Sequence, residues 1–247
     1  MKYGTLFLGL GGILAFYGYL NGGWGWLLLW PAGSFSIVAC GYFGLGARVF
    51  GKRSDGTIAW YGLVFLLPYL IYTWAIWHLS RIIIKEDCYN EISPGLYVGR
   101  RALPHELSPH IQAIVDLTAE FLEPAGVRAG RQYLCLPTLD GSVPADVGFK
   151  HLLETVMRIS EPTYIHCAQG HGRSGTLAAA VLLHKGLARD VEEAITKLQK
   201  ARPGIRLSKP QKALVGRVCG GLPEEHLHGN HSTGRFPVCR RWGDRPD

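Results

Sequence analysis

Two residues suited to phosphate chemistry lie close together in the second half of the chain. Cys167 and Arg173 are separated by five residues, two of which are glycines, and Ser174 follows directly. A thiolate is a strong nucleophile, and a planar guanidinium can donate parallel hydrogen bonds to phosphate oxygens. A neighbouring hydroxyl can hydrogen-bond the sulfur atom. Residue types at this spacing predict nucleophilic attack on a bound phosphoryl group.

The sequence around these residues has the pattern of a strand, a tight loop and a helix. Thr163–Ile165 is β-branched and aromatic, a glycine-rich turn follows, and Leu177–Leu183 is rich in Ala and Leu. A loop at a helix N-terminus presents unpaired backbone N–H groups and the positive end of the helix dipole. Both features bind anions and favour a thiolate over a thiol. We therefore expect the loop to hold the phosphoryl group beside the cysteine.

The stretch His166-Cys-(five residues)-Arg-Ser174 resembles the signature loop of the cysteine-dependent protein tyrosine and dual-specificity phosphatases. The finer pattern Cys-x-x-Gly-x-Gly-Arg-Ser-Gly matches at every fixed position. The resemblance implies that Cys167 is the nucleophile, that Ser174 assists departure of the sulfur, and that His166 supports the loop and the thiolate. The residues expected to contact the phosphoryl group are Ala168, Gln169, Gly170, His171, Gly172 and Arg173.

A phosphatase of this kind also needs an acid to protonate the leaving oxygen. Asp140 lies in Pro137–Pro144, which follows an apolar segment and resembles the mobile acid loop of dual-specificity enzymes. The resemblance implies that Asp140 protonates the leaving group and then activates water. The alternative is a turn residue before Gly141. Asp116 is a second candidate acid, but its apolar strand favours structural hydrogen bonds.

The same glycines also fit a dinucleotide-binding turn. Residues 170–175 have the pattern GxGxxG after a predicted strand, and Asp190 lies twenty positions beyond the first glycine. In that fold the acidic residue ends a second strand. Asp190 instead begins a helical pattern as an N-cap, with Glu193 at the third helical position. The dinucleotide interpretation also gives the cysteine and the arginine no role, so it is the weaker one.

Strands and helices alternate from residue 91 onward. Residues 91–99 predict a turn and a short strand, and apolar or β-branched runs predict further strands at 111–117, 132–136 and 163–165. Spacing predicts helices at about 146–159, 191–201 and 209–219. This alternation predicts an α/β domain with a central, largely parallel sheet flanked by helices. Open sheets of this kind bind ligands at the carboxyl ends of their strands, where Cys167 lies. The resemblance to dual-specificity phosphatases covers about residues 88–220.

The first 80 residues contain three long uncharged stretches, at 5–20, 24–46 and 58–79, with Trp and Tyr towards their ends. About 20 apolar residues cross a bilayer as a helix. We therefore expect an integral, multi-pass membrane protein. Its expected parts are an all-helical transmembrane region of about three helices at 1–80, a juxtamembrane linker at 81–90, a catalytic domain at 91–220 and a disordered tail at 221–247. A cleaved signal peptide could explain the first stretch alone, but further spans follow it.

The basic residues give conflicting indications of the orientation in the membrane. Basic residues flank the third apolar stretch on both sides, with Arg48, Lys52 and Arg53 before it and Arg81, Lys85, Arg100 and Arg101 after it. With three spans, the two basic groups lie on opposite sides of the membrane. Under the positive-inside rule the first group then favours one orientation and the second group favours the other. A thiolate enzyme needs a reducing compartment, which favours a cytoplasmic catalytic domain. The conflict would disappear if the first apolar pair were re-entrant or interfacial.

Composition limits the partners. The net charge of +7 suits anionic substrates or anionic lipid headgroups, and no motif for nucleic acid accompanies it. Six scattered cysteines without a CxxC pair argue against a disulfide scaffold or zinc site, so we expect no metal and no cofactor. Four residues of the tail could be drawn as a metal site, but histidines in such segments are more often solvated. They are His226, His228, His231 and Cys239.

The substrate class stays open between a phosphorylated protein and a phospholipid headgroup, with membrane lipid as an expected partner. His171 stands where phosphoinositide-selective relatives carry a lysine, whereas Ala168 replaces their other lysine. Cys88 or Cys135 could form a protective disulfide with the nucleophile, as partner cysteines do in some relatives. Gln211 could position water, although a solvated helix position is favoured. The competing hypothesis is an inactive, membrane-tethered phosphate-binding module, which would be expected to lack the cysteine, the arginine or the acid.

Overall fold

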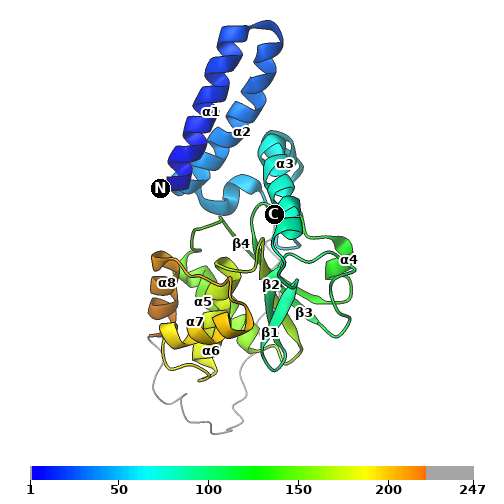
Figure 1. Cartoon of the computed structure of the whole chain (residues 1–247), viewed down its shortest axis with the longest axis vertical. Helices are drawn as coiled ribbons and strands as arrows, with labels where there is room; N and C mark the ends of the chain where they lie inside the picture. The colour runs from blue at the N-terminus through cyan, green and yellow to red at the C-terminus, as the bar shows by residue number, and fades with distance from the viewer. Residues whose placement is uncertain (1, 221–247) are drawn as a thin grey trace, which may run out of the picture.

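The computed structural model describes residues 2–220, so the predicted tail at 221–247 lies outside the described residues. Its α/β domain is built on a five-stranded sheet in the order β1-β2-β5-β3-β4 (Figure 1). β1 is antiparallel to β2, and all other neighbours run parallel, which confirms the predicted largely parallel sheet. The strands are β1 (Tyr89–Ser93), β2 (Leu96–Arg100), β3 (Ala113–Thr118), β4 (Gln132–Thr138) and β5 (Thr163–Cys167).

Helices cover the sheet and separate its strands along the chain. They are α4 (Ala125–Arg128), α5 (Asp146–Met157), α6 (Arg173–His184), α7 (Val191–Ala201) and α8 (Lys209–Cys219). α5–α8 form the main hydrophobic core with one face of the sheet, through residues such as Val115, Ile165 and Leu177. A smaller core containing Ile114 and Tyr164 covers the opposite face. Every residue of β3 is buried, as expected for a central strand covered on both faces.

The N-terminal region is entirely helical. Its elements are α1 (Lys2–Asn21), η1 (Gly23–Leu28), α2 (Leu29–Cys40), η2 (Gly41–Leu45), η3 (Gly46–Phe50) and α3 (Trp60–Ile83). Three helical segments, 2–21, 23–50 and 60–83, are long and apolar enough to cross a membrane. α3 continues to Ile83 and β1 begins at Tyr89, so the connection between them is shorter than the linker expected at 81–90.

α1 and α2 form a hairpin that points away from the α/β domain (Figure 1). The two helices approach closely at Gly11, where a Cβ atom would lie 2.7 Å from Ser36 Oγ and 2.9 Å from the Ala32 carbonyl oxygen. Small residues permit this kind of close contact between apolar helices. At the lower end of the hairpin, one hydrophobic cluster joins both parts of the chain. Phe7, Val38 and Tyr69 from the helices pack there with Ala119 and Leu139 from the α/β domain.

Candidate active site

Cys167 is the last residue of β5 and is buried at the carboxyl edge of the sheet. Its Sγ atom accepts a hydrogen bond from the backbone N–H of Gly170 at 3.2 Å and lies 3.4 Å from Ser174 Oγ. α6 begins at Arg173, so the N-terminus of this helix lies beside the sulfur. Backbone donors, a hydroxyl and a helix N-terminus all stabilise negative charge on a thiolate. The tight loop between strand and helix creates this arrangement.

The carbonyl groups of the loop are bound from outside it. Arg202 is fully buried and donates from Nη2 to the Gln169 carbonyl at 3.1 Å and from Nε to the Gly170 carbonyl at 3.0 Å. The Ala168 carbonyl accepts from Trp77 Nε1 at 3.0 Å, and from a neighbouring backbone amide at 3.2 Å. Three successive carbonyl groups of the loop thus point outward to these donors. The N–H groups of the loop can then face the sulfur, as that of Gly170 does. Sequence reasoning missed both Arg202 and Trp77.

Arg173 is held in one orientation by carboxylates. Its Nη2 and Nη1 atoms pair with Glu120 Oε1 and Oε2 at 2.7 and 2.9 Å, and Nη1 also donates to the Thr138 carbonyl at 2.8 Å. Nε is buried and has no hydrogen-bond partner among residues 2–220. Glu120 therefore takes the outer edge of the guanidinium and leaves the Nε edge available to an anion. Burial alone would lower the pKa of Arg173, but Glu120 and Asp140 raise it well above its usual value.

Asp140 follows β4 and reaches the same guanidinium. Its Oδ1 atom lies 3.2 Å from Arg173 Nη2, although 70% of its side chain is exposed. The Tyr42 hydroxyl, from the N-terminal helical region, donates to the Asp140 carbonyl at 3.0 Å. The structure thus places Asp140 beside the signature loop. A hydrogen bond also connects the Asp140 backbone to the N-terminal helical region.

Residues 100–215 match the family model of a phosphatase domain. That family is described as Swiss Army Knife protein, DSP-PTPase phosphatase domain (PTP-SAK). A 131-residue segment is 28% identical to the dual specificity protein phosphatase CDC14B of Mus musculus, covering 53% of this chain and 26% of CDC14B. The chain thus spans about a quarter of the length of that curated relative.

Solved structures of phosphatases are also similar to this domain. PTPMT1 in complex with PI(5)P matches with a TM-score of 0.49 and 22% identity, over 54% of this chain and 96% of that one. The active form of Tk-PTP matches with a TM-score of 0.49 and 24% identity, over 55% and 98% of the two chains.

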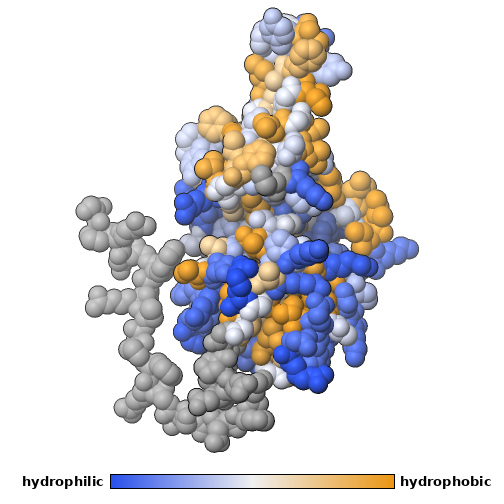
Figure 2. Space-filling view, turned by 90° about the vertical axis from the view of Figure 1, so that its left-hand side faces the viewer, coloured by the Kyte–Doolittle hydropathy of each residue, from blue (hydrophilic) through white to orange (hydrophobic). Residues whose placement is uncertain are grey.

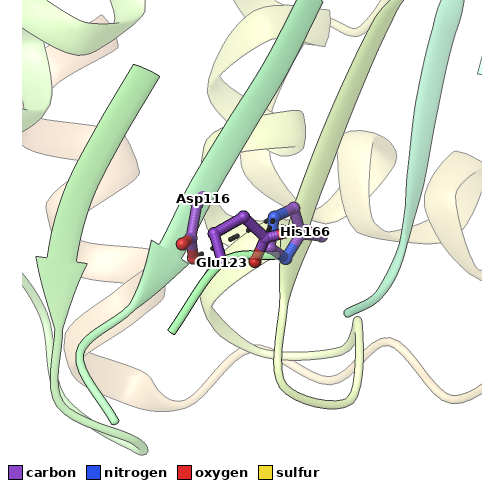
Figure 3. A group of neighbouring side chains, drawn as sticks. All are labelled: Asp116, Glu123 and His166. Carbon is purple, nitrogen blue, oxygen red and sulfur yellow. Dashed lines mark ion pairs between the residues drawn. The ribbon is translucent and has the colours of Figure 1, made fainter. Parts of the chain in front are cut away.

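The imidazole of His166 lies in a separate buried cluster of the α/β domain, shown in Figure 3. Successive residues of a strand point to opposite faces, so His166 and the nucleophile diverge. Its Nε2 atom lies 4.0 Å from Asp116 Oδ1 and 3.9 Å from Glu123 Oε2. Burial lowers the pKa of His166 to about 4, with Asp116 acting in the opposite direction. The ring is therefore neutral at pH 7 and adds no positive charge near Cys167.

Asp116, Glu123 and His166 have ligand atoms within 4.8 Å of one another, a spacing that could suit a metal ion (Figure 3). However, two side-chain cations already lie beside the carboxylates. Lys52 Nζ is 2.5 Å from Asp116 Oδ2, and Arg101 Nε is 3.7 Å from Glu123 Oε2. Burial, followed by the charge of Asp116, raises the pKa of the Glu123 carboxyl. Asp116 is thus already paired with a cation of the protein, and it also accepts hydrogen bonds from the Thr118 backbone N–H and the Tyr133 hydroxyl.

Two side chains near the loop have partners that the sequence did not reveal. His171 Nε2 lies 2.7 Å from Glu86 Oε2, so its ring faces the connection between α3 and β1. Gln211 is buried, and its Oε1 atom accepts from the Ser208 backbone N–H at 2.9 Å. Its amide lies close enough to the loop that a Cβ on Gly172 would come within 3.2 Å of Nε2. The expectation that Gln211 occupies a solvated position is wrong.

The proposed disulfide partners lie too far from the nucleophile in this fold. β3 separates Cys135 on β4 from β5, and β2 separates Cys88 from it. Two strand spacings amount to about 10 Å, whereas disulfide-bonded cysteines have Cα atoms less than about 7 Å apart. Burial also raises the pKa of Cys135 to about 12 and that of Cys88 to about 11. Neither cysteine can bridge to Cys167 without movement of the backbone.

Proposed function

We propose that this chain is a membrane-anchored, multi-pass, cysteine-dependent phosphatase with its catalytic domain in the cytoplasm, and that it hydrolyses phosphomonoesters of lipid headgroups. One observation carries the chemistry: a sulfur with two stabilising donors, an unpaired guanidinium edge and a carboxylate converge at one loop. The sulfur is Cys167 Sγ, the edge is Arg173 Nε, and the carboxylate is that of Asp140. An inactive binding module would have no use for the acid.

The first chemical step forms the thiophosphoryl intermediate. Cys167 Sγ attacks phosphorus, the new P–S bond forms, and the bond to the leaving oxygen breaks as Asp140 supplies a proton. The loop N–H groups and the Nε edge of Arg173 neutralise the phosphoryl oxygens. Asp140 Oδ1 lies 3.2 Å from Arg173 Nη2. A phosphate oxygen that binds Nη2 in its place frees the Asp140 carboxyl to turn towards the leaving oxygen.

The second step returns the enzyme to its starting form. Water attacks phosphorus and gives a proton to Asp140, while the P–S bond breaks and the electron pair returns to sulfur. The Ser174 hydroxyl, 3.4 Å from Sγ, donates a hydrogen bond to the departing thiolate. Inorganic phosphate is released and no cofactor is consumed.

A lipid substrate is favoured because the acid loop rests on the apolar helices. Leu139 packs in the same cluster as Phe7 and Val38, and Tyr42 donates to the Asp140 carbonyl. A cavity of about 760 Å³ lies between segment 41–52 and the acid loop, with Arg48 in its lining. Tyr42 and Arg48 in this lining are an aromatic and a basic side chain of the kind that suits an anionic headgroup presented at a bilayer surface.

The test uses the full chain in lipid nanodiscs, with phosphate release measured from phosphatidylglycerophosphate and phosphoinositide vesicles and from phosphotyrosine and phosphothreonine peptides. We expect release from at least one lipid, and its loss in Cys167→Ser. Faster thiol-dependent release from peptides would overturn the lipid assignment but would still support phosphatase activity. No thiol-dependent release from any of these substrates would instead support the binding module.

A further inference from the structure

The segment just before α3 contacts the phosphatase domain. Lys52 Nζ donates to Asp116 Oδ2 at 2.5 Å and to Thr118 Oγ1 at 2.8 Å, and neither charged side chain is exposed. Four residues before α3, the Gly56 carbonyl accepts from the Glu123 backbone N–H at 3.0 Å. The beginning of α3 is therefore fixed at the carboxyl end of β3 and the loop that follows it.

The end of α3 contacts the same domain. Trp77 Nε1 donates to the Ala168 carbonyl at 3.0 Å, and Ser80 Oγ accepts from Gln169 Nε2 at 2.7 Å. One turn earlier, Trp74 Nε1 donates to a carbonyl of the domain at 3.2 Å. The middle of the helix also contacts this domain, because Tyr69 packs in the cluster that contains Ala119 and Leu139.

These contacts are incompatible with a transmembrane α3. A helix of 24 residues is about 36 Å long, and the hydrocarbon core of a bilayer is about 30 Å thick. If α3 crossed that core, Lys52 and Asp116 would lie on opposite sides of the membrane, whereas they form a buried ion pair. We infer that α3 lies in the membrane interface along the catalytic edge, and that only the α1–α2 hairpin crosses the bilayer among residues 2–220.

The exposed surface of α3 fits a bilayer as its partner. One face is buried against protein through residues including Gly62, Leu66 and Trp77. The opposite face is apolar and exposed, and its members recur at helical spacing: Tyr61, Val64, Phe65, Ile71, Tyr72, Ile76, Leu79, Ile82 and Ile83. Figure 2 shows hydrophobic surface extending from the hairpin down to the largely hydrophilic surface of the α/β domain. An apolar helix face continuous with a spanning hairpin is suited to the interfacial layer.

This topology also removes the conflict between the basic groups. With two crossings, Arg48 and Arg53 before α3 lie on the same side as Arg81 and Lys85 after it. The tip of the hairpin around Gly22 carries no charge and is followed by Trp24 and Trp26. All basic groups near the membrane then lie on the catalytic side, as the positive-inside rule requires for a cytoplasmic phosphatase domain.

Cysteine accessibility in the full-length protein tests this topology. Ser54→Cys reports the loop before α3, Glu154→Cys the phosphatase domain, and Asn21→Cys the hairpin tip; all three positions are exposed. Sealed right-side-out and inside-out vesicles are treated with a membrane-impermeant maleimide. The parent chain, with its six native cysteines, sets the background, and detergent-opened vesicles set full labelling.

We expect Ser54→Cys and Glu154→Cys to label from the same face, and Asn21→Cys from the other. Labelling of Ser54→Cys from the face opposite to Glu154→Cys, or from neither face, would overturn the in-plane placement of α3. Labelling of Asn21→Cys from the same face as Glu154→Cys would overturn the crossing of the hairpin. Because labelling needs no turnover, these outcomes are independent of whether the chain proves to be a phosphatase.

Discussion

At the scale of single residues, the orientation of Arg173 depends on Glu120. The carboxylate pairs with both terminal nitrogens, so the guanidinium meets the proposed phosphate through its Nε edge and through the Nη2 atom that also contacts Asp140. A guanidinium without this partner could rotate about its side-chain torsions. Glu120 is therefore a positioning residue that acts through Arg173.

Glu120→Gln is expected to lower kcat/KM for phosphomonoesters by roughly a hundredfold, because small misplacement of a positioning group costs about this much. The amide keeps the shape of the carboxylate but loses its charge and one acceptor. Steady-state kinetics on the full chain check the effect, with exposed Glu154→Gln as the matched control. Equal kinetics in both variants would contradict a positioning role for Glu120.

His166 should make stability depend on pH. Burial lowers the folded-state pKa to about 4, against about 6.5 in an unfolded chain. Between pH 4 and 6.5 the unfolded state binds more protons, so stability rises with pH across this window and is lost on acidification. The midpoint of thermal unfolding, measured from pH 4 to 7, should vary less in His166→Gln than in the parent. The exposed His151→Gln serves as control, and parallel curves for parent and His166→Gln would refute the assignment.

At the scale of elements, the strand–loop–helix unit needs a glycine at its tightest point. Gly170 has φ of +78°, and a Cβ atom there would overlap the backbone of Gly99 and Arg100 on β2. The loop can pass this close to the neighbouring strand only without a side chain. The carbonyl of the same residue is held by Arg202, so the loop has little freedom to move aside.

Gly170→Ala is therefore expected to destabilise the fold by roughly 1–3 kcal/mol more than a comparable change in open space, and to reduce activity at least tenfold. Gly186→Ala is the matched control, because φ is +65° there but nothing lies within 4 Å of the added atom. Thermal unfolding and phosphate release are compared for both variants. Similar losses in the two would show that backbone strain, and not the contact with β2, is responsible.

At the scale of the whole molecule, the apolar helices and the α/β domain share buried polar contacts. Lys52 and Asp116 form an ion pair in which both side chains are fully buried, and the Tyr133 hydroxyl donates to the same carboxylate at 2.7 Å. Removing one member of such a pair leaves an uncompensated buried charge. The N-terminal helical region thus packs as part of the same folded unit as the α/β domain.

Lys52→Met should lower the free energy of unfolding by about 3–5 kcal/mol. Lys52→Met combined with Asp116→Asn should recover part of this loss, since the uncompensated charge is then absent. Both are measured by thermal unfolding in nanodiscs, together with exposed Arg53→Met as the control. A double variant no more stable than Lys52→Met alone would rule out the buried charge as the cause.

Some of this protein could be predicted from its sequence because the relevant signals are local. The nucleophile, the glycines and the arginine lie within one loop, so strand, turn and helix patterns place them together. α7 (Val191–Ala201) and α8 (Lys209–Cys219) begin and end where their spacing predicts, and the Asp190 side chain caps α7 by accepting from the Glu193 backbone N–H. Hydropathy alone also identified three apolar helices.

Only the tertiary structure revealed which distant residues complete the site. Glu120 lies 53 positions from Arg173, and Trp77 lies 91 positions from Ala168, so no short pattern connects either pair. The inferred placement of α3 likewise depends on contacts between residues that are far apart in the sequence. Length and apolarity are equal for a helix that crosses a bilayer and one that lies along its surface, because both bury apolar side chains in lipid. What distinguishes them is where the two ends are held, and here contacts across the chain hold both ends against one domain.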